Sequence, residues 1–169
     1  MLAQYNQWMN KKLYEAASTL DDTALREDLG AFFGSIMGTL NHILVADILW
    51  LQRFIQHPAD YRSLDYVSGL DKPASLRQLL YPTVGELAAV RTKMDEAIIR
   101  LCEEAREEDF EYSFSYQNTR GEAFTKRFGF LVQHVFNHQT HHRGQATTLL
   151  YQKGIDIGVT DLPAITPAA

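Results

Sequence analysis

The chain has 169 residues, of which 46% are hydrophobic and 22% charged, and its formal net charge is −5. This composition is typical of a globular protein, and a chain of this length can bury roughly 68–70% of its unfolded surface in one core. We therefore expect a single domain over residues 1–169. No cluster of Lys or Arg stands out, which argues against nucleic acid and anionic membranes as partners.

The single cysteine, Cys102, excludes a disulfide within the chain and favours a reducing compartment. The first residues lack the basic and apolar regions of a signal peptide. No run of about 18 apolar residues occurs, so we expect no membrane-spanning helix. Together these features predict a cytoplasmic protein.

Two long helices are predicted in the first third of the chain. The first covers about residues 2–20. The second covers roughly residues 31–56 and ends before His57-Pro58, because the residue before a proline resists helical angles. The second helix is apolar almost all round, so it should be central to the fold or meet a second copy of the chain. We expect a homodimer. His42 lies in the middle of this helix, whereas His57 should be solvated.

The middle of the chain predicts a loop, a helix and a hairpin. Residues 58–73 should form a crossover loop, and residues 74–107 a third helix that Pro82 kinks or splits. Aromatic residues then alternate with polar ones over residues 110–116, and turn residues lead into a return strand over 122–127. The aromatic row could be a base-stacking platform, but no basic residue flanks its first strand, so packing against the helices is the better interpretation.

The last helix is predicted over about residues 128–152, and Lys153-Gly154 closes it. Its inward seam has steps of four and three, at positions 131, 135, 138, 142, 145 and 149. Two of these positions carry imidazoles, so we expect His138 and His142 to point toward the core. The tail from Asp161 to Ala169 should be loosely ordered. Four long helices, one crossover and one short hairpin before the last helix predict an all-α four-helix bundle.

The histidine pair on the last helix is a candidate metal site. Two histidines four residues apart on one helix face can place two ring nitrogens on one metal ion. The pair could instead be core histidines that bond to their neighbours, because buried imidazoles need partners of some kind. A third core-facing histidine, His42, favours the metal site. Three neutral imidazoles suit Zn²⁺, Ni²⁺, Cu²⁺ or Co²⁺, and three protein ligands leave a position for water or substrate.

Other kinds of site find no support in the sequence. No Glu stands three residues before any histidine, which removes the carboxylate-bridged di-iron pattern, and HExxH is absent. No Ser or Cys has the neighbours of a catalytic nucleophile. His134 and His141 lie on the flank of the last helix, as partners of the ligands or as rim residues. Gln145 and Asn41 are candidates to orient water or a ligand.

Several motifs resemble one known family. The segment Asn137–Gln145 resembles the NHxTHHRGQ motif of the DinB/YfiT-like superfamily, Asn41-His42-Ile43 resembles its helix-two motif, and Tyr5-Asn6 belongs to a stretch similar to its N-terminal YNxWxN. The resemblance spans nearly the whole chain. It implies a four-helix bundle with up-down-down-up connectivity, commonly a homodimer. It also implies one divalent metal, Zn²⁺ or Ni²⁺ before others, on residues that correspond to His42, His138 and His142.

The resemblance leaves two classes of function open. Some relatives are thiol-dependent S-transferases or isomerases, others are described as hydrolases, and many have no known activity. The chain is thus either a metal-dependent enzyme, which moves a low-molecular-weight thiol onto an electrophilic small molecule or hydrolyses one, or a metal-binding stress-response protein without turnover. An open metal position beside a pocket would favour the enzyme, and a closed, dry site would favour the binder.

Overall fold

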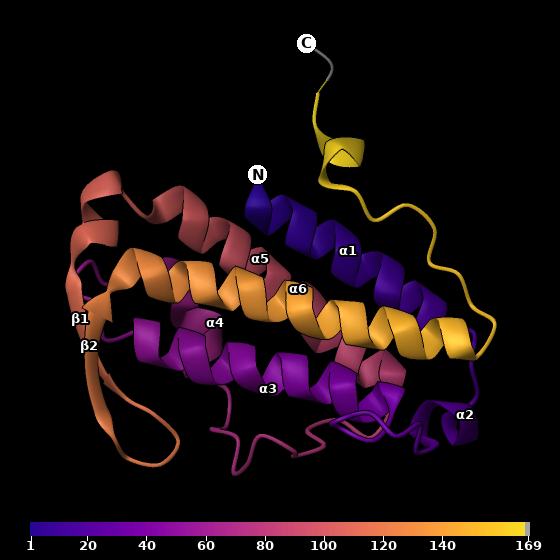
Figure 1. The fold of residues 1–169 in the computed structure, drawn as a ribbon. Coiled ribbons are helices and arrows are strands. Elements are labelled where there is room, and N and C mark those ends of the chain that lie inside the picture. Colours follow the sequence, from indigo (N-terminus) through magenta and orange to yellow (C-terminus); the bar gives the residue numbers. More distant parts are fainter. Residues whose placement is uncertain (168–169) are drawn as a thin grey trace.

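The computed structural model describes residues 1–167 and is mostly helical, with one small antiparallel sheet (Figure 1). The α-helices are α1 (Leu2–Ala17), α2 (Asp22–Arg26), α3 (Ile36–Phe54), α4 (Asp65–Ser68), α5 (Val84–Glu104) and α6 (Phe128–Gln152). The strands are β1 (Ser113–Gln117) and β2 (Ala123–Arg127), and short 3₁₀ helices are η1 (Arg62–Leu64), η2 (Glu107–Glu111) and η3 (Leu162–Ile165). No helix among the described residues is long and apolar enough to cross a membrane.

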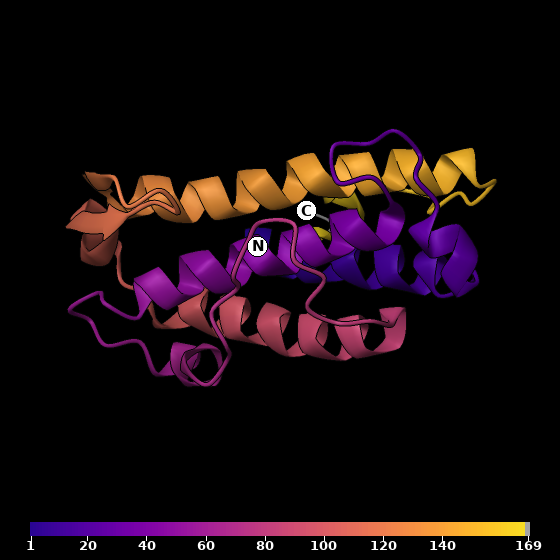
Figure 2. The ribbon, with the colours of Figure 1, turned by 90° about the horizontal axis from the view of Figure 1, so that it is seen from below.

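The four long helices lie side by side, and α1 and α6 run in the direction opposite to α3 and α5 (Figures 1 and 2). α3 packs against α6 and α5, and α1 packs against α5 and α6. Their inward faces form one hydrophobic core to which every long helix contributes. The arrangement brings the middle of α3 against the middle of α6, which are the two segments that carry the candidate metal ligands.

Two helices begin later than the sequence pattern predicts, because side-chain caps fix their first turns. α3 starts at Ile36 and not near residue 31, since the Ser35 hydroxyl accepts from the Gly38 amide at 3.0 Å. α5 starts at Val84 and not near residue 74, since Thr83 caps it in the same way. α1 also ends at Ala17, three residues early. The residues before α3 form a tight turn, where Gly34 adopts a φ of +77°.

The connection between α3 and α5 is only partly the predicted loop. Residues 58–73 contain η1 and α4, and the following residues run as an irregular segment beside α3 up to Thr83 (Figure 2). The Asn41 side chain holds this segment, because its Oδ1 accepts from the amides of Leu80 at 2.8 Å and Tyr81 at 3.2 Å. Residues 74–83, which were predicted to be helical, thus form an irregular segment beside α3, called the strap below.

The predicted hairpin is confirmed, and it packs against one end of the helices. β1 and β2 pair antiparallel from Ser113↔Arg127 to Gln117↔Ala123. Phe114 is buried against Phe54, with ring centroids 6.1 Å apart at 89°. The expectation of a solvated His57 was wrong: the ring is only 4% exposed and lies against Tyr61 and Phe128. The hairpin and η2 cover a histidine that the sequence places next to a proline.

The apolar circumference of α3 has an explanation inside one chain. Nearly every residue from Ile36 to Leu51 is buried by the other helices and by the connecting segment, so no broad face of α3 is left over. The apolar circumference of α3 therefore gives no support to a homodimer, and the homodimer stays a prediction. In the tail that was predicted to be loose, Leu162–Ile165 form η3, and just before the tail Tyr5 Oη donates to the Thr160 carbonyl oxygen at 2.6 Å. Ala168 and Ala169 lie outside the described residues.

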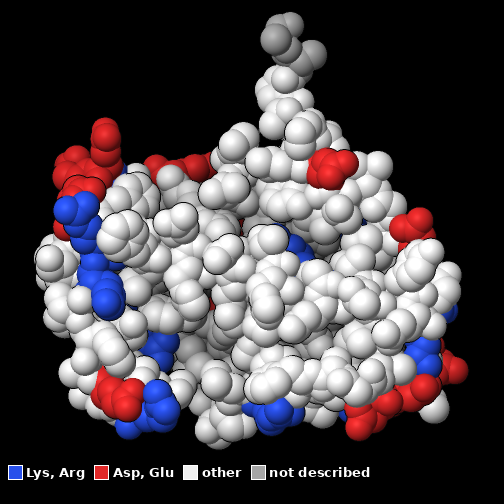
Figure 3. Space-filling view, in the orientation of Figure 1, with Lys and Arg blue, Asp and Glu red and all other residues white. Residues whose placement is uncertain are grey.

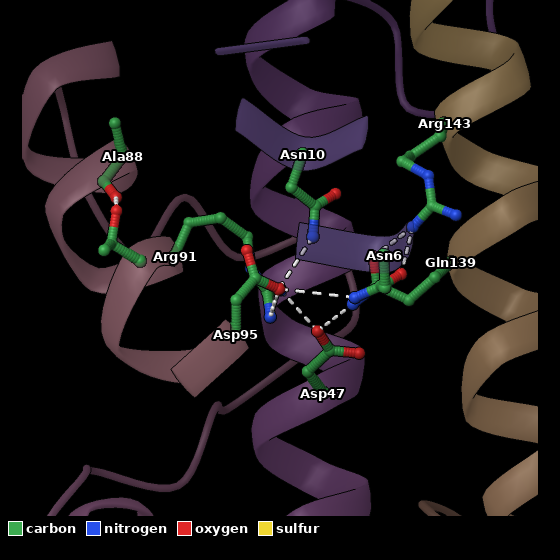
Figure 4. A network of polar contacts seen from close by, with 9 residues as sticks. Asn6, Asn10, Asp47, Ala88, Arg91, Asp95, Gln139 and Arg143 are labelled. Carbon is green, nitrogen blue, oxygen red and sulfur yellow. Dashed lines mark hydrogen bonds and ion pairs between the residues drawn. The ribbon is translucent and has the colours of Figure 1, made fainter. Parts of the chain in front are cut away.

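A buried polar network joins all four long helices (Figure 4). Its members are less than 4% exposed and comprise Asn6, Asn10, Asp47, Arg91, Asp95, Gln139 and Arg143. On one side Asp47 accepts from Arg91 and from Gln139. On the other side Asp95 accepts from Asn10 at 2.9 Å and pairs with Arg91 at 2.9 Å.

The network is balanced in charge, and this pairing offsets much of the free energy that the burial of its charged groups costs. The network contains two carboxylates and two guanidinium groups: both carboxylates contact Arg91, whereas Arg143 donates to Asn6 and to Gln139, the latter at 3.2 Å. A buried charge without a partner would cost several kcal/mol, whereas paired and hydrogen-bonded charges fix one arrangement of the helices. The network therefore sets how α3 and α6 lie relative to each other.

Removing the Asp47 charge should destabilise the fold. We expect Asp47→Asn to lower the free energy of unfolding by about 3 kcal/mol, because Arg91 loses one of its two buried carboxylate partners. Urea unfolding followed by circular dichroism measures this. The matched control is Glu15→Gln, which breaks an exposed pair with Lys11 and should leave the midpoint nearly unchanged. Equal midpoints for both variants would contradict the role given to the network.

Candidate metal centre

Three histidines meet where α3 packs against α6. His42 comes from α3, and His138 and His142 come from successive turns of α6. One ring nitrogen of each lies within 4.8 Å of the others, and the Nε2 atoms of His42 and His138 are 3.2 Å apart. The structure thus brings together the three residues that the sequence analysis selected. Among the described residues, this is the cluster whose ligand atoms are close enough to share one metal ion.

The position of the cluster differs from the predicted one, because the seam of α6 runs along another line. The buried side of α6 passes through Val135, Gln139, Arg143 and Ala146, not through the two histidines. His138 and His142 are half-buried at the edge of this seam. Their rings face α3 from the boundary between core and solvent. A ligand can therefore reach the cluster from outside.

Hydrogen bonds orient two of the three imidazoles. The Nδ1 of His42 lies 2.9 Å from the Leu76 carbonyl oxygen, which can only accept, so Nδ1 carries the proton and Nε2 is free. The Nδ1 of His142 lies 2.8 Å from Gln145 Oε1, which has the same effect. Such partners are typical of metal-binding histidines. Gln145 thus orients the ring of His142, whereas Asn41 holds the segment that carries Leu76. The expected role of both residues in orienting water or a bound ligand stays a prediction.

An aromatic residue that the sequence pattern did not assign to the site packs against the cluster. The ring of Phe33, predicted to be helical, stacks on the His42 ring with centroids 3.7 Å apart at 17°. Phe33 also meets His142 edge-on at 5.5 Å. Phe33 reaches the cluster because it lies in the turn before Ser35 and not in a helix. The apolar pattern of the sequence had predicted a helix there. A Cβ on Gly38 would lie 2.2 Å from the Phe33 carbonyl oxygen, so glycine there permits this close approach.

Burial keeps the cluster neutral. It lowers the pKa of His42 to about 4 and the pKa of His138 to about 3, and it also lowers the pKa of His142. All three imidazoles are therefore uncharged at neutral pH, which is the form that binds metal. No carboxylate belongs to the cluster in the described part of the chain.

One pair of ring nitrogens has the separation expected around a tetrahedral transition-metal ion. Two nitrogen ligands at about 2.05 Å from such an ion are roughly 3.3 Å apart, and the Nε2 atoms of His42 and His138 are 3.2 Å apart. The Nδ1 of His138 is buried and has no hydrogen-bond partner among residues 1–167, so this ring, unlike those of His42 and His142, is not oriented through its second nitrogen. Three neutral nitrogen donors suit zinc, nickel, copper or cobalt, and suit magnesium or calcium poorly.

The other two histidines of α6 lie beside the cluster and outside it. His134 is exposed and packs edge-on against Trp50, with centroids 5.0 Å apart. His141 is exposed, and its Nε2 lies 3.1 Å from Gln145 Nε2. The first is a rim residue, and the second contacts a partner of His142. Neither contributes a nitrogen to the group of three.

A pocket of about 220 Å³ lies directly beside the cluster. Its lining includes His42, His138, His134, Trp50 and Arg53. It shares six lining residues, among them Arg53 and Tyr116, with a larger groove of about 1190 Å³ between α3, the strap and the hairpin. A small molecule could thus enter along the groove and reach two of the three histidines. The middle of the face drawn in Figure 3 is largely uncharged, with charged side chains mostly at its margin.

A mostly helical protein with three neutral histidines at the edge of its core belongs to the class of candidate metal-binding proteins. The chain belongs to the DinB family, whose model matches residues 1–168. It is also similar to the protein DinB of Bacillus subtilis (strain 168), with 26% identity over 165 residues, which cover 95% of this chain and 88% of that protein. No solved structure is significantly similar to the chain.

Loss of one imidazole should empty the site. We expect purified protein to hold one divalent transition metal per chain and His138→Ala to hold less than about a tenth of that amount, because two nitrogens bind far more weakly than three. Elemental analysis after gel filtration measures the metal. His141→Ala is the matched control on the same helix and should stay loaded. Full occupancy in His138→Ala would remove His138 from the ligand set.

Metal affinity should depend weakly on pH. Three ordinary imidazoles of pKa about 6.5 would lose roughly a thousandfold in affinity between pH 7.5 and 5.5. Because the pKa values of His42 and His138 are about 4 and 3, only His142 can titrate in this range. We therefore expect a loss of less than about tenfold. Competition with a chromophoric chelator at both pH values measures it, and a thousandfold loss would show that the imidazoles titrate normally.

Proposed function

We propose that the chain binds one divalent transition metal, Zn²⁺ or Ni²⁺, through His42, His138 and His142, and that it is a metal-dependent enzyme for small molecules, of the thiol S-transferase or hydrolase type. The observation that carries the proposal is a group of three neutral imidazoles, free of carboxylates, that borders a pocket. Membership of the DinB family is compatible with metal binding.

The residues of this chain have distinct tasks in the proposed reaction. A metal ion held by three neutral ligands keeps its full charge and supplies the chemistry of lowering the pKa of a bound water or thiol. The Leu76 carbonyl and Gln145 hold His42 and His142 with their Nε2 atoms free. Phe33 covers the His42 ring and limits access of water on that side. Trp50 and His134 form the wall of the pocket in which a substrate would lie.

The pocket favours the enzyme over the alternative, a non-catalytic metal-binding protein of the stress response. A closed structural site would surround the ion with four protein ligands. Here the cluster offers three, His138 and His142 are only half-buried, and a hollow of about 220 Å³ adjoins it. Thiol transfer is preferred to hydrolysis because the family resemblance favours it, and no residue of the site decides between the two reactions.

The proposal extends to the arrangement and setting of the chain. The opposite directions of α1 and α6 against α3 and α5 support an up-down-down-up four-helix bundle (Figure 1). The homodimer and the cytoplasmic setting rest on the family resemblance and on the single Cys102. The partner of the site is a small molecule, with a low-molecular-weight thiol as one reactant, and neither nucleic acid nor membrane is proposed as a partner.

Thiol consumption tests the reaction. Metal-loaded protein is incubated with common cellular thiols and a chloro or epoxide electrophile, and loss of free thiol is followed. We expect it to be at least about tenfold faster than with His142→Ala, because the thiol needs the metal to ionise near neutral pH. His141→Ala serves as the control and should keep the rate. Equal rates for the wild type and His142→Ala with every thiol would favour the non-catalytic metal binder.

A further inference from the structure

The hollow beside the histidines differs in charge from the rest of the molecule. The chain as a whole carries a net charge of −5. Among the described residues, the lining of the pocket and of the groove contains Arg53 and Lys72 and no Asp or Glu. A cationic hollow in an acidic protein attracts anions and disfavours cations. The charge pattern therefore selects ligands by sign.

Arg53 is the cation that lines both the pocket and the groove. It belongs to the last turn of α3, and its guanidinium lies over the Trp50 ring, 4.7 Å from the centroid. Tyr116 of β1 also lines both the pocket and the groove, and its ring centroid lies 5.6 Å from the guanidinium carbon of Arg53. The Nε of Arg53 donates to the Gln117 carbonyl oxygen at 3.1 Å. These contacts fix the plane of the guanidinium before any ligand binds.

The terminal nitrogens of Arg53 are available for a ligand. Within residues 1–167, Arg53 forms no ion pair with a carboxylate, and its hydrogen bond to Gln117 uses Nε alone. The remaining edge carries Nη1 and Nη2, which match the two oxygens of a carboxylate in a fork. The guanidinium thus has no carboxylate partner in the described part of the chain, although its side chain lines both the pocket and the groove.

The same pocket joins Arg53 to the candidate metal ligands. His42 and His138 line it together with Arg53, and Leu49 and Leu76 contribute apolar side chains to the same lining. A small molecule that lies in this pocket can therefore place an anionic group on Arg53 and the rest of its body beside the histidines. Two anchors in one small cavity restrict both the orientation and the size of a substrate.

We propose that Arg53 is a substrate-binding residue and that the substrate carries a carboxylate, which its Nη1 and Nη2 bind while the reacting end faces His42 and His138. This inference rests on the proposed function for the reaction itself, but the binding of the carboxylate does not require the metal. It assigns the groove between α3, the strap and the hairpin as the path of entry. Neutral and cationic compounds of the same size should bind poorly.

Nuclear magnetic resonance of the tryptophan side chains tests the proposal. The chain contains two tryptophans, Trp8 and Trp50, so its indole N–H spectrum shows two peaks, which Trp50→Phe assigns. Metal-free protein is titrated with succinate and with its uncharged analogue succinamide. We expect succinate to shift the Trp50 peak and to bind at least about tenfold more tightly than succinamide, because a charge-assisted pair is lost with the amide. The Trp8 peak should not move.

Substitutions identify the residue responsible. Arg53→Gln should remove the preference for succinate, and Arg53→Lys, which keeps the charge without the fork, should reduce it. Arg120→Gln is the matched control, because it removes one positive charge from the exposed turn of the hairpin, where Arg120 pairs with Glu122 at 3.3 Å. Equal preference in Arg53→Gln and the wild type, or equal affinity for the two compounds, would overturn the proposal.

The result is independent of the metal proposal. Succinate has no thiol, and the titration contains no metal, so binding through Arg53 supports this inference even where the thiol-consumption assay fails. Conversely, a loaded metal site does not rescue it when succinate and succinamide bind alike. Repeating the titration with zinc-loaded protein should leave the Arg53 dependence in place.

Discussion

The pairing of the Asp47 carboxylate with two other helices is the constraint on which the rest of the structure depends. A carboxylate buried in the core must find charged and hydrogen-bonded partners, because its desolvation costs several kcal/mol. Asp47 finds Arg91 on α5 and Gln139 on α6. Apolar side chains could slide past one another with little change in free energy, whereas these directional contacts allow a single register. The network therefore fixes the positions of α3, α5 and α6 relative to one another along their axes.

That register places the histidines. Gln139 directly follows His138 on α6, and Asp47 stands little more than one helical turn after His42 on α3. The contact between Asp47 and Gln139 lies in the same α3–α6 interface as the pair of His42 and His138, whose Nε2 atoms are 3.2 Å apart. Two ring nitrogens at this distance can form one hydrogen bond between neutral rings or share one metal ion, and burial disfavours an added, charging proton because it lowers both pKa values. The polar network and the candidate metal centre therefore both join α3 to α6.

The sequence predicted the bounds of the last helix better than those of the other long helices. The helix was placed at residues 128–152, as observed, since a change of period marks its start and Gly154, with a φ of +78°, follows its end. The starts of α3 and α5 were placed about five and ten residues too early. In both cases apolar residues before the cap, such as Phe33 and Leu76, continued the helical period by chance. The caps themselves, Ser35 and Thr83, were visible in the sequence and should have outweighed that period.

A heptad pattern could not predict the polar network, because it assigns only apolar positions to the core. For the same reason the predicted buried face of α6 ran through His138 and His142 instead of Gln139 and Arg143. A seam drawn through His138 and His142 follows steps of three and four, whereas the buried line runs in steps of four through Gln139 and Arg143. The missed signal is a polar pair at four-residue spacing, which α6 shares with Asn6 and Asn10 on α1 and with Arg91 and Asp95 on α5. Polar pairs that recur on apolar faces need partners on one another, because solvent cannot reach them. With those pairs assigned to the core, the two histidines of α6 fall one position away, at its edge, where they can bind a metal and still meet a substrate.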